Sequence, residues 1–380
     1  MQPSSLLSYY PNFGILDEIV SYGPYKQINL YIDLKNNMQS TYMEHAIVNI
    51  VESSLRSRMY DTSVFSSLIS FLAFHKRYSL NREIKMKYFI FFESGQSYYH
   101  KNISKQYKVS RRIDDLYGLD HEKRELFFKV LNANYNMIEN ACNKIPDMKV
   151  FRLQNLEADF IPYYLIRNKL VETDPSVGHV VYSNDHDLMQ CVQENVYVYQ
   201  KVGSKIKRIM KQGEVMKKEM GKPNTIPDEY LPLALAIIGD PGDDVYGIKG
   251  IGPASFIKAF DKLKKIIGSM EALYDNVMNG NPIFDLSKCS IPNKIMKQII
   301  DFEENQGGIT RNMKLVSFEI LSRIMDDPPT IELLNRRKHI EKILETESLT
   351  SLDPLKDALT RTRVELESSA LEILFHNTGG

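Results

Sequence analysis

Cysteine is scarce in this chain of 380 residues, which contains only Cys142, Cys191 and Cys289. The three are scattered and form no CxxC pair, which argues against a disulfide framework and against a thiolate zinc site. An excess of charge is also lacking, since 48 basic residues balance 48 acidic ones. Any affinity for nucleic acid must therefore come from local segregation of charge.

Long apolar runs are missing too. No window approaches the length of a membrane span, and the chain does not open with a basic region followed by an apolar run. We therefore expect a protein without membrane contact, in a reducing cytoplasm or in the host cytoplasm if the source is viral.

Hydrophobic residues make up 43% of the chain, which is enough for a sizeable core. A chain of this length suits one large domain with insertions or two packed domains. Short apolar runs predict strands at 28–34, 87–93, 149–153, 179–184 and 196–202. Helical patterns alternate with them at 38–59, 64–75, 120–144, from about 155, at 227–238, at 256–277 and beyond 291. This alternation predicts an α/β fold with a mostly parallel central sheet flanked by helices. Two segments fit less well: we expect residues 1–26 to be a surface extension and 201–222 to be part loop and part amphipathic helix.

Acidic residues gather where these strands end and where helices begin. They are Asp33, Glu93, Glu157, Asp159, Asp185, Asp187, Asp240 and Asp243. Each alone has an ordinary explanation, as when acids in a first helical turn complement the helix dipole. Together at the carboxyl edge of one parallel sheet they would repel one another, and divalent cations would relieve that repulsion. Oxygen ligands without His or Cys predict Mg²⁺ or Mn²⁺, and a group this large fits two ions and phosphodiester hydrolysis.

The stretch AIIGDPGDDVYGIKGIGPASF, residues 236–256, joins an apolar helix end to an acidic loop and a glycine hairpin. Gly247, Gly250 and Gly252 would let backbone amides approach a phosphate closely, and a helix that begins at Pro253 would add its positive N-terminus. Acidic glycine-rich turns are also common without function. The spacing matches neither the dinucleotide GxGxxG motif nor a P-loop.

Residues 94–113 contain no acid but carry cations interleaved with aromatic residues. The cations are Lys101, Lys105, Lys108, Arg111 and Arg112, and the aromatic residues are Tyr98, Tyr99, His100 and Tyr107. A solvated helix face has the same composition. The aromatic rings favour nucleic acid, because they can stack on bases.

Six motifs in one order resemble the 5′ nucleases, a family that includes flap endonucleases, the nuclease domain of bacterial DNA polymerase I and phage-type ribonuclease H exonucleases. The match covers roughly residues 28–260. Its motifs are the Asp33 strand, the Glu93 strand, YKVSR at 107–111, EAD at 157–159, SNDHDLMQ at 183–190 and GDPGDDVYGIKGIGPA from 239. The last resembles the family's GDxxDNxxGxxGIG, a helix-three-turn-helix motif that grips duplex DNA. RNMKLVSFE at 311–319 is a weaker echo of phage members.

The resemblance implies a role for each matched residue. It implies that Asp33, Glu93, Glu157 and Asp159 surround one metal ion and that Asp185, Asp187, Asp240 and Asp243 surround the second. It implies a helical arch near 97–145, with Lys108 and Arg111 at its base as catalytic residues that steady the scissile phosphate. The residues expected to contact DNA are Lys101, Lys105, Arg112, Gly247, Lys249, Gly250, Gly252 and Lys258. A monovalent cation such as K⁺ would bind the hairpin carbonyls.

Three positions depart from the family pattern. Glu93 stands where Asp is usual, so the carboxylate reaches one methylene further. Phe160 replaces a second Asp of bacterial and many phage members, although eukaryotic flap endonucleases also lack that acid. We expect Phe160 to pack into the core. Asp244 replaces the usual Asn and would add charge near the second metal.

The function implied is a 5′ to 3′ exonuclease and flap endonuclease of replication or repair that acts as a monomer on DNA with a 5′ flap, nick or RNA primer. A sliding clamp or a single-stranded-DNA-binding protein would be its protein partner. The alternatives are a PIN-like RNA-processing nuclease, which the duplex-gripping hairpin disfavours, and a DNA-binding module with a decayed site, which Asp185 and Asp187 disfavour. The expected divisions are an extension at 1–26, a nuclease core at 27–225, a helical region at 226–350 and a tail at 351–380.

Overall fold

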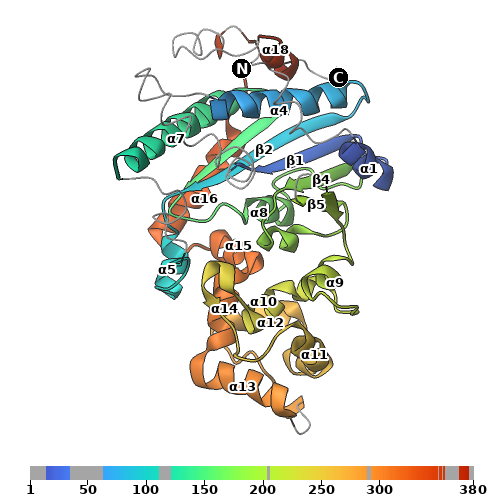
Figure 1. Cartoon of the computed structure of the whole chain (residues 1–380), viewed down its shortest axis with the longest axis vertical. Coiled ribbons are helices and arrows are strands. Elements are labelled where there is room, and N and C mark those ends of the chain that lie inside the picture. The colour runs from blue at the N-terminus through green and yellow to red at the C-terminus, as the bar shows by residue number, and fades with distance from the viewer. Residues whose placement is uncertain are drawn as a thin grey trace.

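A six-stranded sheet crosses the upper half of the molecule, in the strand order β3-β2-β1-β4-β5-β6 (Figure 1). We describe residues 14–34, 63–110, 121–202, 206–288, 292–349, 351–352, 354–355 and 368–375 of this computed structural model. The strands are β1 (Gln27–Asp33), β2 (Lys85–Ser94), β3 (Met148–Gln154), β4 (Val177–Tyr182), β5 (Val196–Val202) and β6 (Ile206–Met210). Neighbouring strands pair in parallel except β6, which runs antiparallel to β5. The predicted fold class is therefore confirmed.

Side chains of the central strands alternate between two buried layers, as the pleat requires. Ile28, Leu30 and Ile32 of β1 face one hydrophobic cluster, while Tyr31 between them faces the other. Because both faces are covered, β1 is buried at every position and reads in the sequence as a continuous apolar run.

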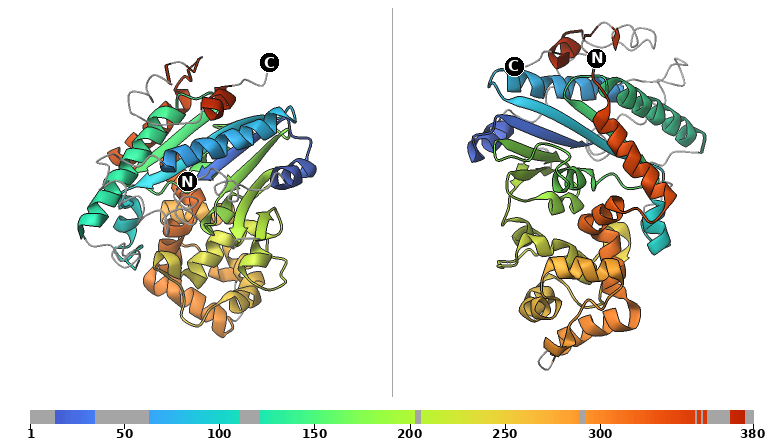
Figure 2. Two further views of the ribbon diagram at one scale, coloured as in Figure 1. Left: turned by 45° about the horizontal axis from the view of Figure 1, so that its top comes forward. Right: turned by 180° about the vertical axis from the view of Figure 1, so that it is seen from behind.

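Helices cover the two faces unequally. Four lie over the first face: α1 (Gly14–Tyr22), α4 (Ser63–Leu80), α7 (His121–Cys142) and α18 (Ser368–Phe375). The second face packs on α8 (Ile161–Arg167) and α16 (Ile331–Glu345). The right panel of Figure 2, in which the molecule is seen from behind, shows α16 running along the sheet from the lower helices.

The hydrophobic cluster of the second face continues without a break into the lower, helical half of the molecule. That half contains α10 (Leu231–Ile238), α11 (Pro253–Ile267), α12 (Met270–Asn279), α13 (Lys294–Gln306), α14 (Gly308–Val316) and α15 (Phe318–Asp326). Between α10 and α11 lies a two-stranded ribbon of β7 (Gly239–Asp240) and β8 (Val245–Tyr246). The glycine hairpin thus sits on the same core as the sheet. Among the described helices, none combines the length and apolar character of a membrane span.

Three expectations about local structure were wrong. The segment expected to be loop and amphipathic helix contains the short helix α9 (Val215–Glu219) but also β6, whose IKRIM sequence pairs with β5 and buries Met210. Helix α1 lies within the expected surface extension, yet Leu16 and Ile19 are buried. The helix expected from about 155 begins only at Ile161, after a turn. The helix expected at 38–59 lies outside the described residues.

A charged network joins α8 of the sheet half to α15 of the helical half. Glu319 accepts hydrogen bonds from Arg167 Nε at 2.6 Å, Arg323 Nε at 2.6 Å and the Tyr163 hydroxyl at 2.9 Å. Burial alone would raise the pKa of Glu319, but the hydrogen bonds from Arg167 and Arg323 outweigh burial and lower it. Arg167 also pairs with Asp326 at 2.7 Å. The network fixes how the two halves meet.

We predict that Glu319→Gln lowers the free energy of unfolding by about 3 kcal/mol, because it leaves two largely buried guanidinium groups without their shared carboxylate. The folded pKa of Glu319 is lowered, so its charge stabilises the protein above the unfolded pKa and that stability is lost as pH falls through the folded pKa. Urea unfolding at neutral and acidic pH measures both effects. Glu304→Gln, at an exposed position of α13, is the control. Equal stability of the two variants would contradict the prediction.

Candidate metal centre and nucleic-acid interface

The acids predicted from the strand ends lie at one edge of the sheet because the parallel strands end in register. Asp33 pairs with Phe91 of β2, and Glu93 two residues further pairs with Leu153 of β3. Strand β4 ends at Tyr182, directly before the segment that carries Asp185. The carboxyl ends of three neighbouring strands therefore deliver acids to one place.

Ser183 positions two of these acids. Its hydroxyl donates to Asp33 Oδ2 at 2.6 Å and accepts from the backbone N–H of Asp185 at 3.0 Å. Asp185 Oδ1 in turn accepts from the backbone N–H of Asp187 at 3.0 Å. This chain of hydrogen bonds fixes the acids of β1 and of the 183–187 segment relative to one another.

A compact oxygen group forms where this segment meets the acidic loop. Asp187, Asp240 and Asp243 each present one carboxylate oxygen, and the three oxygens lie within 4.8 Å of one another. Asp240 Oδ1 also accepts from the backbone N–H of Gly242 at 2.9 Å, which fixes the loop around it. The spacing suits a hard divalent cation.

The remaining predicted ligands interact electrostatically around Asp159, but among the described residues they do not form a second group as compact as the first. Burial raises the pKa of Asp159 well above its usual range, and the charges of Asp33 and Glu93 raise it further. Burial likewise raises the pKa of Asp187, as do the charges of Asp185 and Asp243. The acids therefore repel one another strongly. An all-oxygen set with this deficit of positive charge fits divalent cations.

Lys108 lies between the two groups. Its Nζ pairs with Glu157 and also with Asp243 Oδ2 at 3.3 Å. Burial lowers the pKa of Lys108, but the charges of Glu157 and Asp243 outweigh burial and raise it, so the side chain stays protonated. Its backbone has a positive φ of 52°. Lys108 thus neutralises part of the cluster from the base of the predicted arch.

Sequence reasoning missed the hydrogen bonds that join the 107–110 segment to the acidic loop. The Tyr107 hydroxyl donates to Asp243 Oδ2 at 2.9 Å, and the backbone N–H of Lys108 donates to Asp243 O at 3.0 Å. The backbone N–H of Ser110 donates to Asp244 Oδ2 at 2.7 Å. Asp244 therefore orients toward the arch segment, and its φ of 56° is one that Asp and Asn tolerate better than most residues.

The aromatic residues of the basic segment differ in how far they are buried. Tyr107 and His100 are buried and stacked, with ring centroids 4.7 Å apart, and the Tyr99 hydroxyl donates to Lys314 O at 3.1 Å. These three rings support the local fold, so the expectation that they stack on bases was wrong. Tyr98 is 61% exposed and remains accessible.

The predicted DNA contacts are spread along the arch segment and the hairpin. Lys105, Lys249 and Lys258 are exposed, whereas the Lys101 ammonium donates to Tyr107 O within the arch segment. Arg111 and Arg112 lie outside the described residues. Phe160 is fully buried against Tyr164, as expected, and it does not join the acidic cluster.

The three hairpin glycines are there for different reasons. A Cβ on Gly247 would lie 2.1 Å from the carbonyl carbon of Ile238, so Gly247 is required by packing. Gly250 has a φ of 84°, which favours glycine, but a Cβ there meets no protein atom within 4 Å. Gly252 has a φ of −123° and equally open surroundings. Neither the backbone nor the protein's own packing requires glycine at position 252.

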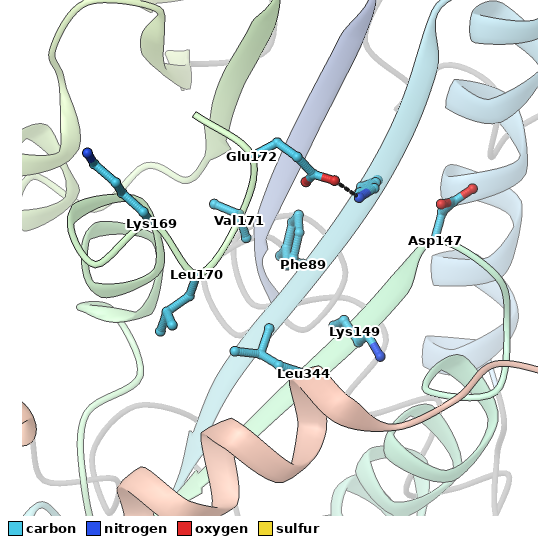
Figure 3. A pocket seen from close by; sticks show the side chains of 9 residues that line it. Phe89, Asp147, Lys149, Lys169, Leu170, Val171, Glu172 and Leu344 are labelled. Carbon is cyan, nitrogen blue, oxygen red and sulfur yellow. Dashed lines mark hydrogen bonds and ion pairs between the residues drawn. The ribbon is translucent and has the colours of Figure 1, made fainter. Parts of the chain in front are cut away.

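A separate pocket of about 510 Å³ lies far from the acids, near the beginnings of β2 and β3 (Figure 3). Lys87, Lys149 and Lys169 line it together with Glu172 and Leu344 of α16. Glu172 pairs with Lys87, drawn as the dashed line in Figure 3. This pocket is independent of the candidate metal centre.

No protein-family model matches the chain. A 5′-3′ exonuclease of Aquifex aeolicus is 28% identical over 212 residues, which are 55% of this chain and 67% of that protein. This relative points to the 5′ nuclease family, and the structural neighbours share the fold.

Two of the structural neighbours are crystal structures of the D15 protein of bacteriophage T5. One, crystallised with metal ions, has a TM-score of 0.53 and 17% identity and covers 84% of this chain and 100% of its own. Another, D15 flap endonuclease in a complex with DNA and metal ions, has a TM-score of 0.53 and 18% identity and covers 84% of this chain and 99% of its own. The resemblance to 5′ nucleases that the six motifs predicted is therefore confirmed, and this chain shares the fold of the D15 protein.

We predict that Asp244→Asn leaves stability unchanged, because an amide oxygen can also accept the Ser110 N–H and Asn tolerates positive φ. Asp244→Ala should lower the free energy of unfolding by about 2 kcal/mol through the lost hydrogen bond and the strained backbone. Thermal unfolding with and without Mn²⁺ measures stability and metal affinity together. A large loss of metal affinity in Asp244→Asn would identify Asp244 as a ligand and contradict this assignment.

Proposed function

We propose that this protein is a metal-dependent 5′ to 3′ exonuclease and structure-specific endonuclease that acts on DNA carrying a 5′ flap, nick or RNA primer. The observation that carries the proposal is the cluster of acids at the carboxyl edge of the sheet, beside a hairpin with open glycines. The shared fold with D15 flap endonuclease and the sequence likeness to the Aquifex exonuclease support it.

The acids are proposed to bind two divalent cations, Mg²⁺ or Mn²⁺. Asp187, Asp240 and Asp243, with Asp185, would hold one ion. The other group is Asp33, Glu93, Glu157 and Asp159. When bound, such ions supply an activated water and stabilise charge on the leaving oxygen.

The chain's own cations and amides are proposed to position the substrate. Lys108 approaches Asp243 at 3.3 Å, so its ammonium is placed to meet a phosphate that enters the cluster. Arg111 would act beside it. Lys101, Lys105 and Arg112 would contact the strand that passes the arch.

Duplex DNA is proposed to bind the lower half through a helix-three-turn-helix unit of α10, the hairpin and α11. Gly250 and Gly252 leave room for a phosphate, and Lys249 and Lys258 are exposed on either side of Gly252 in sequence. A K⁺ ion on the hairpin carbonyls would strengthen the same contact. In this division, 27–225 is the nuclease core and 226–350 the duplex-binding region, and the biological role is primer removal or repair.

A labelled 5′-flap duplex, incubated with Mg²⁺ or with chelator, tests the proposal directly. We expect cleavage near the junction only with metal. Preferential cleavage of single-stranded RNA would instead favour an RNA-processing nuclease on a PIN-like sheet, and binding without cleavage under any metal would favour a DNA-binding module.

We predict that Asp187→Asn lowers the cleavage rate by at least about 1000-fold, because it removes one charge from the shared ligand group. Duplex binding, measured in chelator, should stay within about twofold of wild type. Asp301→Asn, on the exposed face of α13, is the matched control and should cut normally. Wild-type cleavage by Asp187→Asn would refute the ligand assignment.

Gly252→Ala provides a clean test of the phosphate contact. The new Cβ would have no protein atom within 4 Å, and the φ of −123° at this position is one that alanine adopts. Folding should therefore be unaffected. We predict that affinity for flap duplex nevertheless falls about tenfold, because the Cβ occupies the space of the phosphate. Gly247→Ala, which collides with Ile238, should instead destabilise the fold. Unchanged duplex affinity in folded Gly252→Ala would mean that the hairpin is only a turn.

A further inference from the structure

Tyr246 is an exposed aromatic residue whose apolar neighbours in the 245–251 segment are buried. Val245 is 2% exposed, Ile248 9% and Ile251 5%, whereas Tyr246 is 63% exposed. Within the described part of the chain, its ring contacts no other ring and its hydroxyl has no hydrogen-bond partner. The family pattern GDxxDNxxGxxGIG leaves this position open, so the motif itself does not account for the tyrosine.

The backbone that presents Tyr246 is held firmly. Tyr246 pairs with Gly239 across the β7–β8 ribbon, and its carbonyl accepts from Asn312 Nδ2 at 2.9 Å. Asn312 is 1% exposed and also donates to Ala236 O at 2.9 Å. Gly247, the next residue, is fixed by its close packing against Ile238. The ring thus extends into solvent from a rigid support.

The position of Tyr246 lies between the two parts of the proposed nuclease site. The register of the ribbon pairs Asp240 with Val245, so Tyr246 directly follows the residue opposite a candidate metal ligand. On its other side the hairpin begins, with exposed Lys249 three residues away. A DNA strand that ran from the hairpin to the acids would pass Tyr246.

We propose that Tyr246 stacks on a base of the bound DNA, next to the phosphate that is cut, and so positions the strand between the duplex grip and the acidic cluster. This inference rests on the proposed nuclease function. An exposed aromatic face beside cations is the usual platform for nucleic-acid bases, and the contact tolerates any base because each has a π-face. Tyr246 would therefore be a positioning residue that senses the presence of a base and not its identity.

Single-turnover cleavage of a flap duplex with one abasic nucleotide, moved stepwise along the cut strand, tests the contact. For wild type, we expect one position near the junction to slow cleavage about 5- to 100-fold. Tyr246→Ala should cut the intact substrate equally slowly and lose nothing more at that position, whereas Tyr246→Phe should retain the wild-type pattern. Tyr246→Ala that cuts at the wild-type rate, or that remains as sensitive as wild type to the abasic position, overturns the proposal.

Fluorescence provides a readout that does not depend on cleavage. The chain has no tryptophan, so Tyr246→Trp introduces a single indole. In chelator, intact flap duplex should quench this indole, and duplex that is abasic at the sensitive position should quench it much less. Ile331→Trp, at an exposed site that begins α16, is the control and should not distinguish the two duplexes. Equal quenching of Tyr246→Trp by both duplexes overturns the stacking contact.

The two proposals fail in different ways. Wild type that cuts flap DNA with Mg²⁺, together with an insensitive Tyr246→Ala, removes only the role of Tyr246. Wild type that cuts no flap DNA removes the proposed function and the tyrosine contact with it.

Discussion

Mutual repulsion among buried carboxylates is the constraint around which this molecule is arranged. Parallel strands that end in register bring acids together, and burial strengthens their repulsion, as the raised pKa of Asp159 and Asp187 indicates. The structure holds them with short-range ties: Ser183 between Asp33 and Asp185, and Lys108 between Glu157 and Asp243. These ties orient the oxygens and neutralise only part of the cluster, so the negative charge that remains, which fits divalent cations, is a direct consequence of how the chain folds.

A second consequence concerns the lower half of the molecule. The acidic loop lies between α10 and α11 of the helical half, and its Asp240 lies close to Asp187, which follows β4 of the sheet. Asn312 fastens that loop to α14, and Glu319 fastens α15 to α8. The motif RNMKLVSFE contains both residues. The motif therefore ties the acidic loop into the helical half through Asn312 and joins the helical half to the sheet half through Glu319.

Much of the fold could be predicted because the central strands are short, continuous apolar runs that end in acids. The five parallel strands and the acids of the candidate site follow from that pattern. Strand β6 could not be predicted, since IKRIM alternates weakly and acquires its structure by pairing with β5. Helix α1 could not be predicted either, because a short helix in a polar segment shows too little hydrophobic periodicity to be recognised without its packing partners.

The sequence predicted which residues make up the candidate site but not the hydrogen bonds that connect them. Ser183, Tyr107 and Asn312 lie in motifs that the sequence highlights, yet their hydrogen bonds span 66 to 150 residues. Asp244 was expected to add charge near a metal ion, but its contact with the backbone N–H of Ser110 could not be predicted from the pattern. Such long-range geometry is decided by packing, which a residue pattern does not record.

The close contact between Gly247 and Ile238 has a further meaning for the proposed nuclease. Because no atom can be inserted there, the number of residues between Asp243 and the hairpin sets a fixed length along the backbone. The loop would therefore set a constant spacing between the proposed duplex contact at the hairpin and the acidic cluster. In the proposed nuclease, the position of the cut along a DNA strand would then depend on the length of the three-residue segment 244–246 and not on the base sequence.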